Sequence, residues 1–391
     1  MNILTFTTLF PNDRMPTLGI FIWERMRHVA QRERVRVVAP VPWSPPGPLP
    51  QRWARFRDVS RLENKEGIAV HHPRYLVTPK VGMRYYGRWM AAATKNIVDR
   101  LHRESAIDLI DSHYVYPDGE AAMLHAQRLG VPFVVSARGT DINLYPEIPA
   151  VRPRIVEVLK RADRLIGVCT ALAERMVELG AHPDRVEVIP NGVDSSAFSP
   201  MPMIEARALV GLPPDVPIVV TIANLVERKG VHLLIDAIAT VTGADGSPAH
   251  LVVVGDGDEK ERLVAQASRM GLSDRVHFVG MVGHKQLRPW FCAGDVSVLA
   301  SSREGWPNAV MESLACGRGV IATRVWGTPE ILTSEELGIL VDERSAPALA
   351  EAMNRGLRHR FDPEAMQRFT AQSSWDRVAE RVIGVFGDVV R

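Results

Sequence analysis

The sequence predicts an α/β protein made of two doubly wound halves of similar size, each built on a parallel sheet. Strand-like and helix-like segments alternate along nearly the whole chain, which is the pattern of parallel strands joined by crossover helices. The alternation pauses near residues 194–205 and then begins again, and 391 residues exceed one ordinary core. We therefore expect one domain at residues 1–195, joined by a final helix at 372–391, and a second domain at residues 196–371.

In the first half, short apolar runs bounded by turn residues indicate buried strands, and apolar residues at helical spacing indicate the helices between them. The strands are expected at residues 2–6, 35–41, 109–113, 133–136, 165–168 and 186–189. The helices are expected at residues 21–31, 81–102, 119–129, 155–161 and 171–179.

The second half repeats the pattern. Its strands are expected at residues 217–222, 250–254, 276–279, 296–300, 320–323 and 339–341, and its helices at 231–241, 259–270, 286–292, 309–316 and 346–355. Two such halves that face each other would form a cleft, in which a substrate can be gripped from both sides and closed off from water.

Composition indicates an ordinary globular protein, with 46% hydrophobic and 24% charged residues. The three cysteines are far apart in sequence and lie in apolar segments, which argues against a disulfide framework or a zinc site and for a reducing compartment. Residues 1–10 have the pattern of a strand and not of a signal peptide, and no stretch reaches the length of a membrane span. We expect a cytoplasmic protein.

The net charge of +2 hides an asymmetry along the chain. Residues 1–103 carry 18 Lys/Arg against 7 Asp/Glu, whereas residues 196–391 carry 20 against 24. A basic front half favours an anionic partner, either a membrane surface or a phosphate-bearing substrate. The alternative is that these arginines are scattered, solvated positions. Nucleic acid is not an expected partner.

Glu304 and Glu312 are the first candidate functional residues. Glu304 follows the strand expected at residues 296–300, and Glu312 lies in the first turns of the next expected helix. Ligands of open α/β sheets bind at the carboxyl ends of the strands, so the two carboxylates can grip two hydroxyl-rich parts of one ligand. The alternative for Glu312 is a plain charge on a helix face.

Lys229 and Gly230 follow the first strand of the second half, where Gly230 opens a helix. A helix amino terminus attracts anions and Lys229 adds a full positive charge, so this point can hold a diphosphate; a solvated lysine is the alternative. The turn Gly255-Asp256-Gly257 lets backbone approach a ligand. No GxGxxG follows the first strand and no P-loop occurs, which argues against nicotinamide dinucleotide and P-loop ATPase chemistry.

Short motifs in a fixed order over nearly the whole chain resemble those of one enzyme family. They are Phe10-Pro11 with Gly19, Ile189-Pro190-Asn191-Gly192-Val193-Asp194, Leu225 through Lys229-Gly230, Val254-Gly255-Asp256-Gly257, Val279-Gly280, Ser301 with Glu304-Gly305, Glu312-Ser313-Leu314-Ala315-Cys316-Gly317, and Gly327-Thr328-Pro329-Glu330. Jointly they are specific, and the chain resembles the retaining glycosyltransferases of family 4. This resemblance implies the GT-B architecture, with two facing Rossmann-like domains, a cleft between them and a last helix that crosses back to the first domain.

The resemblance implies a nucleotide-diphosphate sugar as donor, no cofactor, and a role for each matched position. Lys229 would bind the diphosphate, Glu304 the donor sugar and Glu312 the nucleotide ribose. The other donor-side positions would be Gly19 and Gly255 in the loops near the phosphates, Asn224 before Lys229, Met281 and Val282 beside the base, and the backbone of Trp306, Pro307, Asn308 and Ala309 along the sugar and phosphates.

Two positions depart from the family's pattern. Asn224 stands where an arginine is usual, so the diphosphate clamp would lose one charge. Arg138, in Arg138-Gly139-Thr140-Asp141, stands where a histidine is usual; it cannot act as a base but can bind a phosphate or a sugar carboxylate. Arg138 and Asp141 are the expected catalytic and acceptor-side residues. His113 at a strand end is expected to face the cleft with them, although a structural role fits it equally. Its surroundings resemble a subgroup linked to bacterial cell-surface polysaccharides of the teichuronic-acid type.

The acceptor is expected to be a glycan or a lipid-linked sugar. Residues 80–90 mix basic, aromatic and apolar side chains ahead of a helix, which favours contact with an anionic inner-membrane surface unless the rings pack on the sheet. We expect transfer without a metal ion, with Lys229 and the helix amino terminus stabilising the leaving diphosphate.

Two other classes of function stay open on the sequence alone. A GT-B epimerase or phosphorylase would have the same two domains, although the lysine context of a pyridoxal-phosphate enzyme is not evident. A non-catalytic nucleotide-sugar-binding partner protein would fit the departures at Asn224 and Arg138. Analogy of fold and site favours the transferase.

Overall fold

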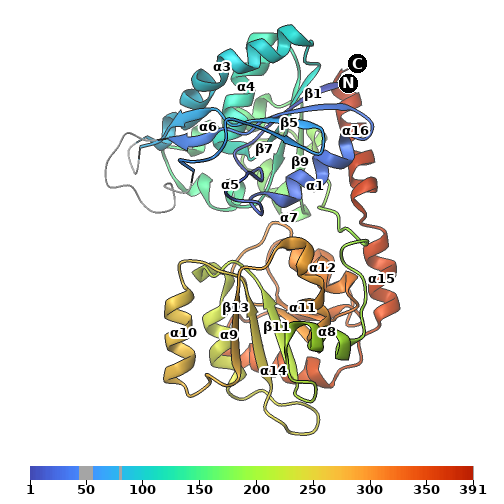
Figure 1. Cartoon of the computed structure of the whole chain (residues 1–391). Coiled ribbons are helices and arrows are strands. Elements are labelled where there is room, and N and C mark those ends of the chain that lie inside the picture. Colours follow the sequence, from blue (N-terminus) through green and yellow to red (C-terminus); the bar gives the residue numbers. More distant parts are fainter. Residues whose placement is uncertain (44–55, 79–81, 391) are drawn as a thin grey trace. The chain divides into compact units, whose positions relative to one another are not determined.

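The computed structural model describes residues 1–43, 56–78 and 82–390 and divides into two compact units (Figure 1). Unit 1 comprises Met1–Gly192 together with Trp375–Arg391, and unit 2 comprises Val193–Ser374. The two junctions, after Gly192 and after Ser374, each lie three residues from the expected domain boundaries after residues 195 and 371.

Unit 1 is built on a sheet with the strand order β10-β9-β8-β7-β1-β2-β5-β4, in which all neighbours are parallel except the hairpin β4–β5. The central strands are buried along their whole length because helices cover both faces, and each contains a short apolar stretch that marks it in the sequence. The strands are β1 (Asn2–Phe6), β2 (Arg34–Val38), β4 (Leu62–Lys65), β5 (Ile68–His71), β7 (Leu109–His113), β8 (Phe133–Ala137), β9 (Arg164–Gly167) and β10 (Val186–Val188).

The helices of unit 1 lie between these strands, with short turns at several loops. The helices are α1 (Ile20–Val29), α3 (Tyr86–Glu104), α4 (Glu120–Leu129), α5 (Thr140–Asn143), α6 (Arg152–Arg161), α7 (Thr170–Glu178) and α16 (Trp375–Val390). The turns are η1 (Met83–Tyr85), η2 (Val115–Gly119), η3 (Tyr145–Glu147) and η4 (Pro183–Arg185).

The segment between β2 and α3 is the part of unit 1 that the sequence did not predict. It contains the hairpin β4–β5 and a separate parallel pair, β3 (Val41–Trp43) with β6 (Arg74–Leu76). β4 is Leu-Glu-Asn-Lys and only partly buried, so it has no apolar run that would mark it as a strand. This strand forms because it pairs with the edge of the sheet, and not because its own residues favour a strand.

The last helix, α16, returns to unit 1 as expected. It packs along α1, and Val382 and Phe386 share a buried cluster with Ile22 and Met26 of α1 (Figure 1). In the described part of the chain, no helix combines the length and apolar character needed to cross a bilayer.

Unit 2 is built on an all-parallel sheet with the order β13-β12-β11-β14-β15-β16. Successive residues of β11 enter different apolar clusters, Val219 on one face and Ile218 and Val220 on the other, so both faces are covered. The strands are β11 (Ile218–Ile222), β12 (His250–Val254), β13 (Val276–Gly280), β14 (Val296–Leu299), β15 (Val320–Thr323) and β16 (Gly338–Val341).

The helices of unit 2 cover this sheet and lead back toward α16. They are α8 (Met203–Val210), α9 (Val231–Ile238), α10 (Lys260–Arg269), α11 (Arg288–Ala293), α12 (Asn308–Ala315), α13 (Thr328–Ile331), α14 (Ala346–Arg358) and α15 (Pro363–Ala371), with turns η5 (Glu227–Lys229) and η6 (His284–Gln286). The three cysteines are free thiols, but Cys292 and Cys316 are not far apart in space: Sγ of Cys292 lies 3.9 Å from the carbonyl oxygen of Cys316.

Candidate active site

Two loops at the topological switch point of unit 2 carry the main donor-side candidates. β11 has β12 on one side and β14 on the other, so the loops that leave β11 and β14 diverge at the carboxyl edge of the sheet. Ligands of open α/β sheets bind in the crevice between such loops. Lys229 ends η5 after β11, and Glu304 lies in the loop between β14 and α12.

The side chains of Lys229 and Glu304 meet across this switch point. The Lys229 ammonium donates to Oε1 of Glu304, the Ser301 hydroxyl donates to the same oxygen at 2.6 Å, and the Arg228 guanidinium lies 3.9 Å from Oε2. Burial raises the pKa of Glu304, but the Lys229 charge and these hydrogen bonds outweigh it and hold the pKa below its ordinary value. Glu304 is therefore an enclosed but ionised carboxylate, paired with a cation that an incoming anion can attract.

Backbone packing holds the Lys229 loop against the Glu304 loop. Gly230 caps α9 with a φ of 70°, and a Cβ there would lie 2.2 Å from the carbonyl oxygen of Ala300 at the end of β14. The same oxygen accepts a 2.8 Å hydrogen bond from Nε of Arg344. Any larger residue at position 230 would push the two loops apart. The pair Lys229-Gly230 therefore supplies both the positive charge and the close contact between the loops.

Glu312 is held by a residue that sequence reasoning missed. Nε2 of His284, in η6, lies 2.8 Å from Oε1 of Glu312, and the two side chains are largely buried. The His284 ring also packs edge-on against Phe198, with centroids 5.1 Å apart. In the sequence, His284 is only a histidine in the turn after β13. Nothing in that pattern indicates that its partner is a carboxylate 28 positions later.

The other donor-side candidates lie along the same edge of the unit 2 sheet. Asn224 is exposed after β11, Gly255 follows β12 where a Cβ would lie 1.9 Å from the carbonyl oxygen of Ala223, and Met281, after β13, is 62% exposed. Val282, Trp306 and Ala309 pack against one apolar core of the unit, Pro307 is buried and Asn308 begins α12. The structure therefore brings the loops after four neighbouring strands together at one edge.

The acceptor-side candidates gather at the corresponding edge of unit 1, whose switch point lies between β1 and β7. Gly19, a donor-side candidate, lies at the same edge and caps α1 with a φ of 63°. His113 ends β7, and Arg138 and Asp141 follow β8.

Asp141 is fully buried and joins two strand ends through backbone hydrogen bonds. Its Oδ1 accepts from the N–H groups of Gly139 at 2.8 Å and Arg138 at 3.0 Å, and its Oδ2 accepts from the N–H of Val115 at 2.8 Å. Burial raises the pKa of Asp141 above its ordinary value although each of these bonds lowers it. With its oxygens occupied in this way, Asp141 positions the loop that carries Arg138.

Arg138 is oriented by His113, and this corrects the expectation that His113 faces a ligand. The His113 ring is fully enclosed: its Nδ1 accepts from Nη2 of Arg138, and its Nε2 lies 2.9 Å from Oδ2 of Asp111. Burial lowers the pKa of His113 to about 4, so the ring is neutral near pH 7. Nη1 of Arg138 donates to Oδ1 of Asn191 at 3.0 Å. Asp111 could have been noticed from the sequence because it lies two positions before His113 on the same face of β7.

A second guanidinium lies in the same region. Arg25 is fully buried, where its Nη1 donates to the Ser136 hydroxyl at 3.0 Å, and burial lowers its pKa to about 10. Burial, and then the Arg25 charge, also lower the pKa of Arg138 below its ordinary value. Asp111 acts on both guanidinium groups with the opposite charge, and Asp141 also acts on Arg138. Buried carboxylates therefore already balance part of the charge of the two cations.

Asp118 is a further residue to which the sequence assigned no role. It is fully buried, and its Oδ2 accepts from the Thr8 hydroxyl at 3.0 Å, which ties the loop after β1 to the loop after β7 at the switch point. Burial raises its pKa well above the ordinary value. The motif Tyr116-Pro117-Asp118-Gly119 was the available signal.

Two family models match this chain: "Glycosyltransferase Family 4" over residues 18–197, and "Glycosyl transferases group 1" over residues 216–359. A D-inositol 3-phosphate glycosyltransferase of Acidothermus cellulolyticus is 32% identical over 304 residues, which cover 72% of this chain and 67% of that protein. The chain belongs to glycosyltransferase family 4. The Bacillus subtilis (strain 168) protein named "Putative teichuronic acid biosynthesis glycosyltransferase TuaC" is 29% identical over 364 residues, 91% of this chain and 89% of its own length.

A solved structure of Anabaena Alr3699/HepE in complex with UDP matches with a TM-score of 0.75 at 18% identity, over 99% of this chain and all of that one. The GT-B class expected from the sequence is confirmed by this likeness of fold. Family membership also confirms an enzyme of the glycosyltransferase class and disfavours an epimerase or a phosphorylase.

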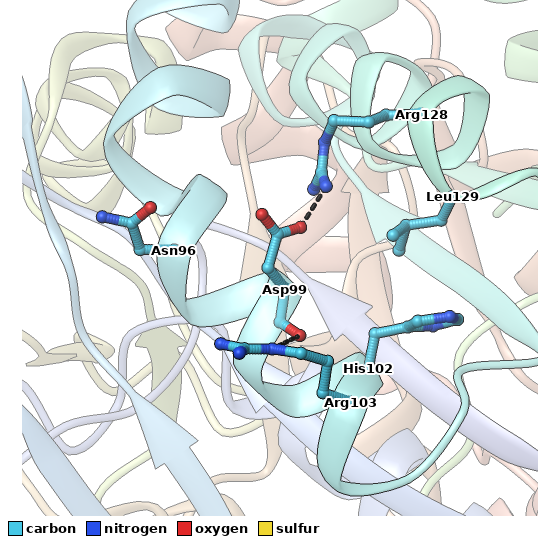
Figure 2. Close-up of a pocket in the computed structure, with 6 residues that line it drawn as sticks. All are labelled: Asn96, Asp99, His102, Arg103, Arg128 and Leu129. Carbon is cyan, nitrogen blue, oxygen red and sulfur yellow. Dashed lines mark hydrogen bonds and ion pairs between the residues drawn. The ribbon is translucent and has the colours of Figure 1, made fainter.

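Two other places on this family 4 glycosyltransferase have features of a ligand site. A hollow of about 410 Å³ lies at the ends of α3 and α4 (Figure 2). β7 and β8 begin after these helices, whereas Arg138 follows the other end of β8. In the hollow, Arg128 is ion-paired with Asp99, and Nε of Arg103 donates to the backbone carbonyl oxygen of Asp99, so these charged side chains already have partners (Figure 2). This hollow is separate from the candidate active site.

Asp256 and Asp258 have a spacing at which two carboxylates can share a metal ion. Asp256, however, lies 3.0 Å from the Lys260 ammonium and accepts from the N–H of Gly257, and Asp258 is exposed. Within the residues that the structure describes, no three His, Cys, Asp or Glu side chains are grouped as metal ligands.

Proposed function

We propose that this family 4 enzyme transfers a sugar from a nucleotide-diphosphate sugar to a glycan or lipid-linked acceptor, with retention of the anomeric configuration, in cell-surface polysaccharide biosynthesis. The observation that carries the proposal is the pairing of Lys229 with ionised Glu304 at the switch point of unit 2. A cation for the diphosphate and a carboxylate for the sugar hydroxyls then lie side by side, at the place where an α/β sheet binds its ligand.

In the proposed reaction, the bond between the anomeric carbon and the diphosphate oxygen breaks while the acceptor oxygen bonds to the same face of the sugar. Negative charge develops on the leaving diphosphate. Lys229 and the amino terminus of α9 neutralise that charge, and preorganised groups of this kind are each worth about 3–4 kcal/mol. Glu304 fixes the sugar through its hydroxyls and needs to form no covalent bond.

We further propose that transfer needs no divalent metal ion and no cofactor. Lys229, with Arg228 near Glu304, supplies the positive charge that a metal would otherwise bring to the diphosphate. Asn224 makes this clamp one charge weaker than the family's usual arrangement, so Lys229 carries more of the task. Activity that falls in EDTA and returns with Mg²⁺ would rule this proposal out.

For the acceptor, we propose that Arg138 binds an anionic group, a phosphate or a sugar carboxylate. The supporting observation is that His113 and Asn191 fix the plane of the guanidinium, while burial beside Arg25 leaves its charge poorly solvated. A guanidinium held in one plane suits the fork-like pairing with phosphate or carboxylate oxygens. The named relatives, which include an inositol-phosphate glycosyltransferase and a teichuronic acid biosynthesis protein, agree with an anionic acceptor.

A lipid-linked acceptor would require contact with a membrane surface, and we propose the start of α3 for that contact. Arg84 and Arg88 are exposed there, and the Tyr85 ring stacks on Trp89 with centroids 5.7 Å apart. Lys80 and Val81, part of the same predicted segment, lie outside the described residues. Flotation with anionic liposomes at low salt tests this contact. The proposal is supported if the wild type binds the liposomes and the double variant Arg84→Glu, Arg88→Glu does not. It is contradicted if the wild type does not bind.

The direct test of the function is a transfer assay with nucleotide sugars and an acceptor extract, followed by NMR of the product's anomeric proton. An anomeric configuration equal to that of the donor supports retaining transfer. Inversion would contradict the mechanism, and binding of a nucleotide sugar without transfer or hydrolysis would instead support the non-catalytic partner protein.

A further inference from the structure

Trp326, in the loop between β15 and α13, has a backbone conformation that its residue type disfavours. Its φ is 46°, in the left-handed region, where a bulky side chain clashes with its own backbone. The next residue, Gly327, would adopt that conformation at no cost, yet its φ is −75°. Strain of this kind persists where the surrounding structure enforces it, often at a ligand site.

The described residues contain two other positive-φ positions that are not glycine, Glu66 and Tyr114, with which Trp326 can be compared. Glu66, with a φ of 47°, is in the two-residue turn of the hairpin β4–β5 beside Gly67, where both turn positions favour positive φ. Tyr114, with a φ of 88°, directly follows β7 among the acceptor-side candidates. Turn geometry therefore explains Glu66, whereas Tyr114 and Trp326 are both strained at the carboxyl ends of strands.

Core packing does not account for Trp326. Two other tryptophans of unit 2, Trp290 and Trp306, pack against an apolar core of the unit. The Trp326 ring is only partly buried, and it is not among the described side chains that pack against either apolar core of unit 2. The Trp326 ring is carried by a strained backbone and lies outside both cores. Part of its surface therefore remains available to a ligand.

The loop that carries Trp326 is tied directly to the loop that carries Glu304. The Thr323 hydroxyl at the end of β15 donates to the carbonyl oxygen of Ser301 at 2.6 Å, and the Ser301 hydroxyl in turn holds Glu304. The N–H of Val325 donates to the carbonyl oxygen of Thr323 at 2.9 Å, and the N–H of Thr328 to that of Val325 at 3.0 Å. These bonds hold Trp326 three residues beyond a contact with the proposed sugar-binding loop.

We propose that the indole of Trp326 is the apolar wall of the donor-sugar subsite and contributes to the choice of sugar. The proposal rests on the proposed function, since it assumes that Glu304 binds the hydroxyls of a donor pyranose. A pyranose ring has a face of C–H groups besides its hydroxyls, and such a face packs on an aromatic ring. Glu304 and Trp326 would then bind the polar edge and the apolar face of the same sugar.

The test separates the sugar from the nucleotide. Wild type, Trp326→Gly and Trp326→Phe are titrated calorimetrically with UDP-glucose, UDP-N-acetylglucosamine, GDP-mannose, ADP-glucose and dTDP-glucose. UDP, GDP, ADP and dTDP serve as the sugar-free counterparts. For the nucleotide sugar that the wild type binds, Trp326→Gly should weaken binding about tenfold, as loss of one aromatic contact does, and leave binding of the bare nucleoside diphosphate within about twofold. Trp326→Phe should stay within about threefold of the wild type.

Stability provides the second readout, because glycine relieves the strain at this φ. The Tm of Trp326→Gly should equal or exceed that of the wild type, and Glu66→Gly is the matched control that relieves a similar strain without altering any binding. A lowered Tm with equal loss of nucleotide and nucleotide-sugar binding would mean a structural ring and overturn the proposal. An unchanged ratio of the two affinities would overturn it as well. If the wild type bound none of these nucleotides or nucleotide sugars, both the proposed function and this role of Trp326 would be contradicted.

Discussion

The carboxyl edges of the two sheets hold their charged groups in opposite ways. In unit 1, Asp141 accepts three backbone N–H groups and His113 is enclosed between Asp111 and Arg138. In unit 2, the acidic groups are paired mainly through side chains, Glu304 with Lys229 and Glu312 with His284. A ligand can replace a side-chain partner without breaking backbone structure, whereas it cannot replace backbone bonds without unfolding a loop. The unit 2 edge is therefore built to exchange partners, and the unit 1 edge to hold one arginine in place.

The largest effect is expected at the exchangeable pair. Lys229→Ala should lower kcat by about 10²–10³-fold, because one preorganised positive group is lost from the leaving diphosphate. The fold should survive, with a fall in Tm of a few degrees, because the enclosed Glu304 carboxylate loses its nearest cation but keeps the Ser301 hydroxyl and the Arg228 guanidinium. Arg228→Ala is the matched control: this neighbour lies 3.9 Å from Glu304 and should cost less than about tenfold. Equal losses in the two variants would show that charge alone matters and not the position of Lys229.

The next largest effect is on stability and falls in unit 1. Asp141→Ala should lower the free energy of unfolding by about 2–4 kcal/mol, because it leaves several buried N–H groups without partners. Asp256→Ala, which removes a surface ion pair with Lys260, should cost less than about 1 kcal/mol. Urea denaturation measures both values, and a small effect of Asp141→Ala would mean that the two edges do not differ as described.

A smaller effect is expected for Arg138→Lys, which keeps the charge but loses the planar fork. The KM for an anionic acceptor should rise by about tenfold, while the Kd for the donor stays unchanged. If donor and acceptor constants changed together, Arg138 would act on the fold of the unit and not on the acceptor.

The smallest effect is a pH dependence of stability, and it has two opposing parts in unit 1. Burial lowers the pKa of His125 to about 4, so protonation favours the unfolded state and stability is lost as the pH falls from about 6.5 toward 4. Burial raises the pKa of Glu120 to about 7, so its contribution is present below pH 4.5 and is lost as the pH rises toward 7.

Chemical denaturation at a series of pH values separates these two contributions. His125→Gln should flatten the loss of stability on the acid side, and Glu120→Gln should flatten the loss on the approach to neutral pH. Identical profiles for wild type and both variants would show that neither group keeps a shifted pKa in the folded protein.

The sequence predicted the framework of the fold because the central strands are buried on both faces and each contains a short apolar stretch. β1 and β7 have the same bounds in the structure as in the sequence prediction. β4 was missed because its residues are polar and its pairing at a sheet edge is a tertiary effect. The periodicity of apolar residues carries no information about which segment will pair with the edge of a sheet.

For the candidate site, the sequence predicted the loops but not the partners within them. Lys229, Glu304 and Glu312 could be found because loops after parallel strands meet at one edge of a sheet. The partnership of Glu312 with His284, and the enclosure of His113, depend on rotamers and packing across distant segments. The strain at Trp326 is a property of the backbone alone, and no residue pattern predicted it.

The measurement that tests the central claim most directly is a thermal-shift and calorimetric titration of wild type and Lys229→Ala with UDP-, GDP-, ADP- and dTDP-sugars. We expect that one nucleotide class stabilises the wild type and that Lys229→Ala loses most of this stabilisation, while its own Tm without ligand falls by only a few degrees. Undiminished binding by Lys229→Ala, or no stabilisation of the wild type by any nucleotide sugar, would contradict the assignment of the unit 2 switch point as the diphosphate-sugar site.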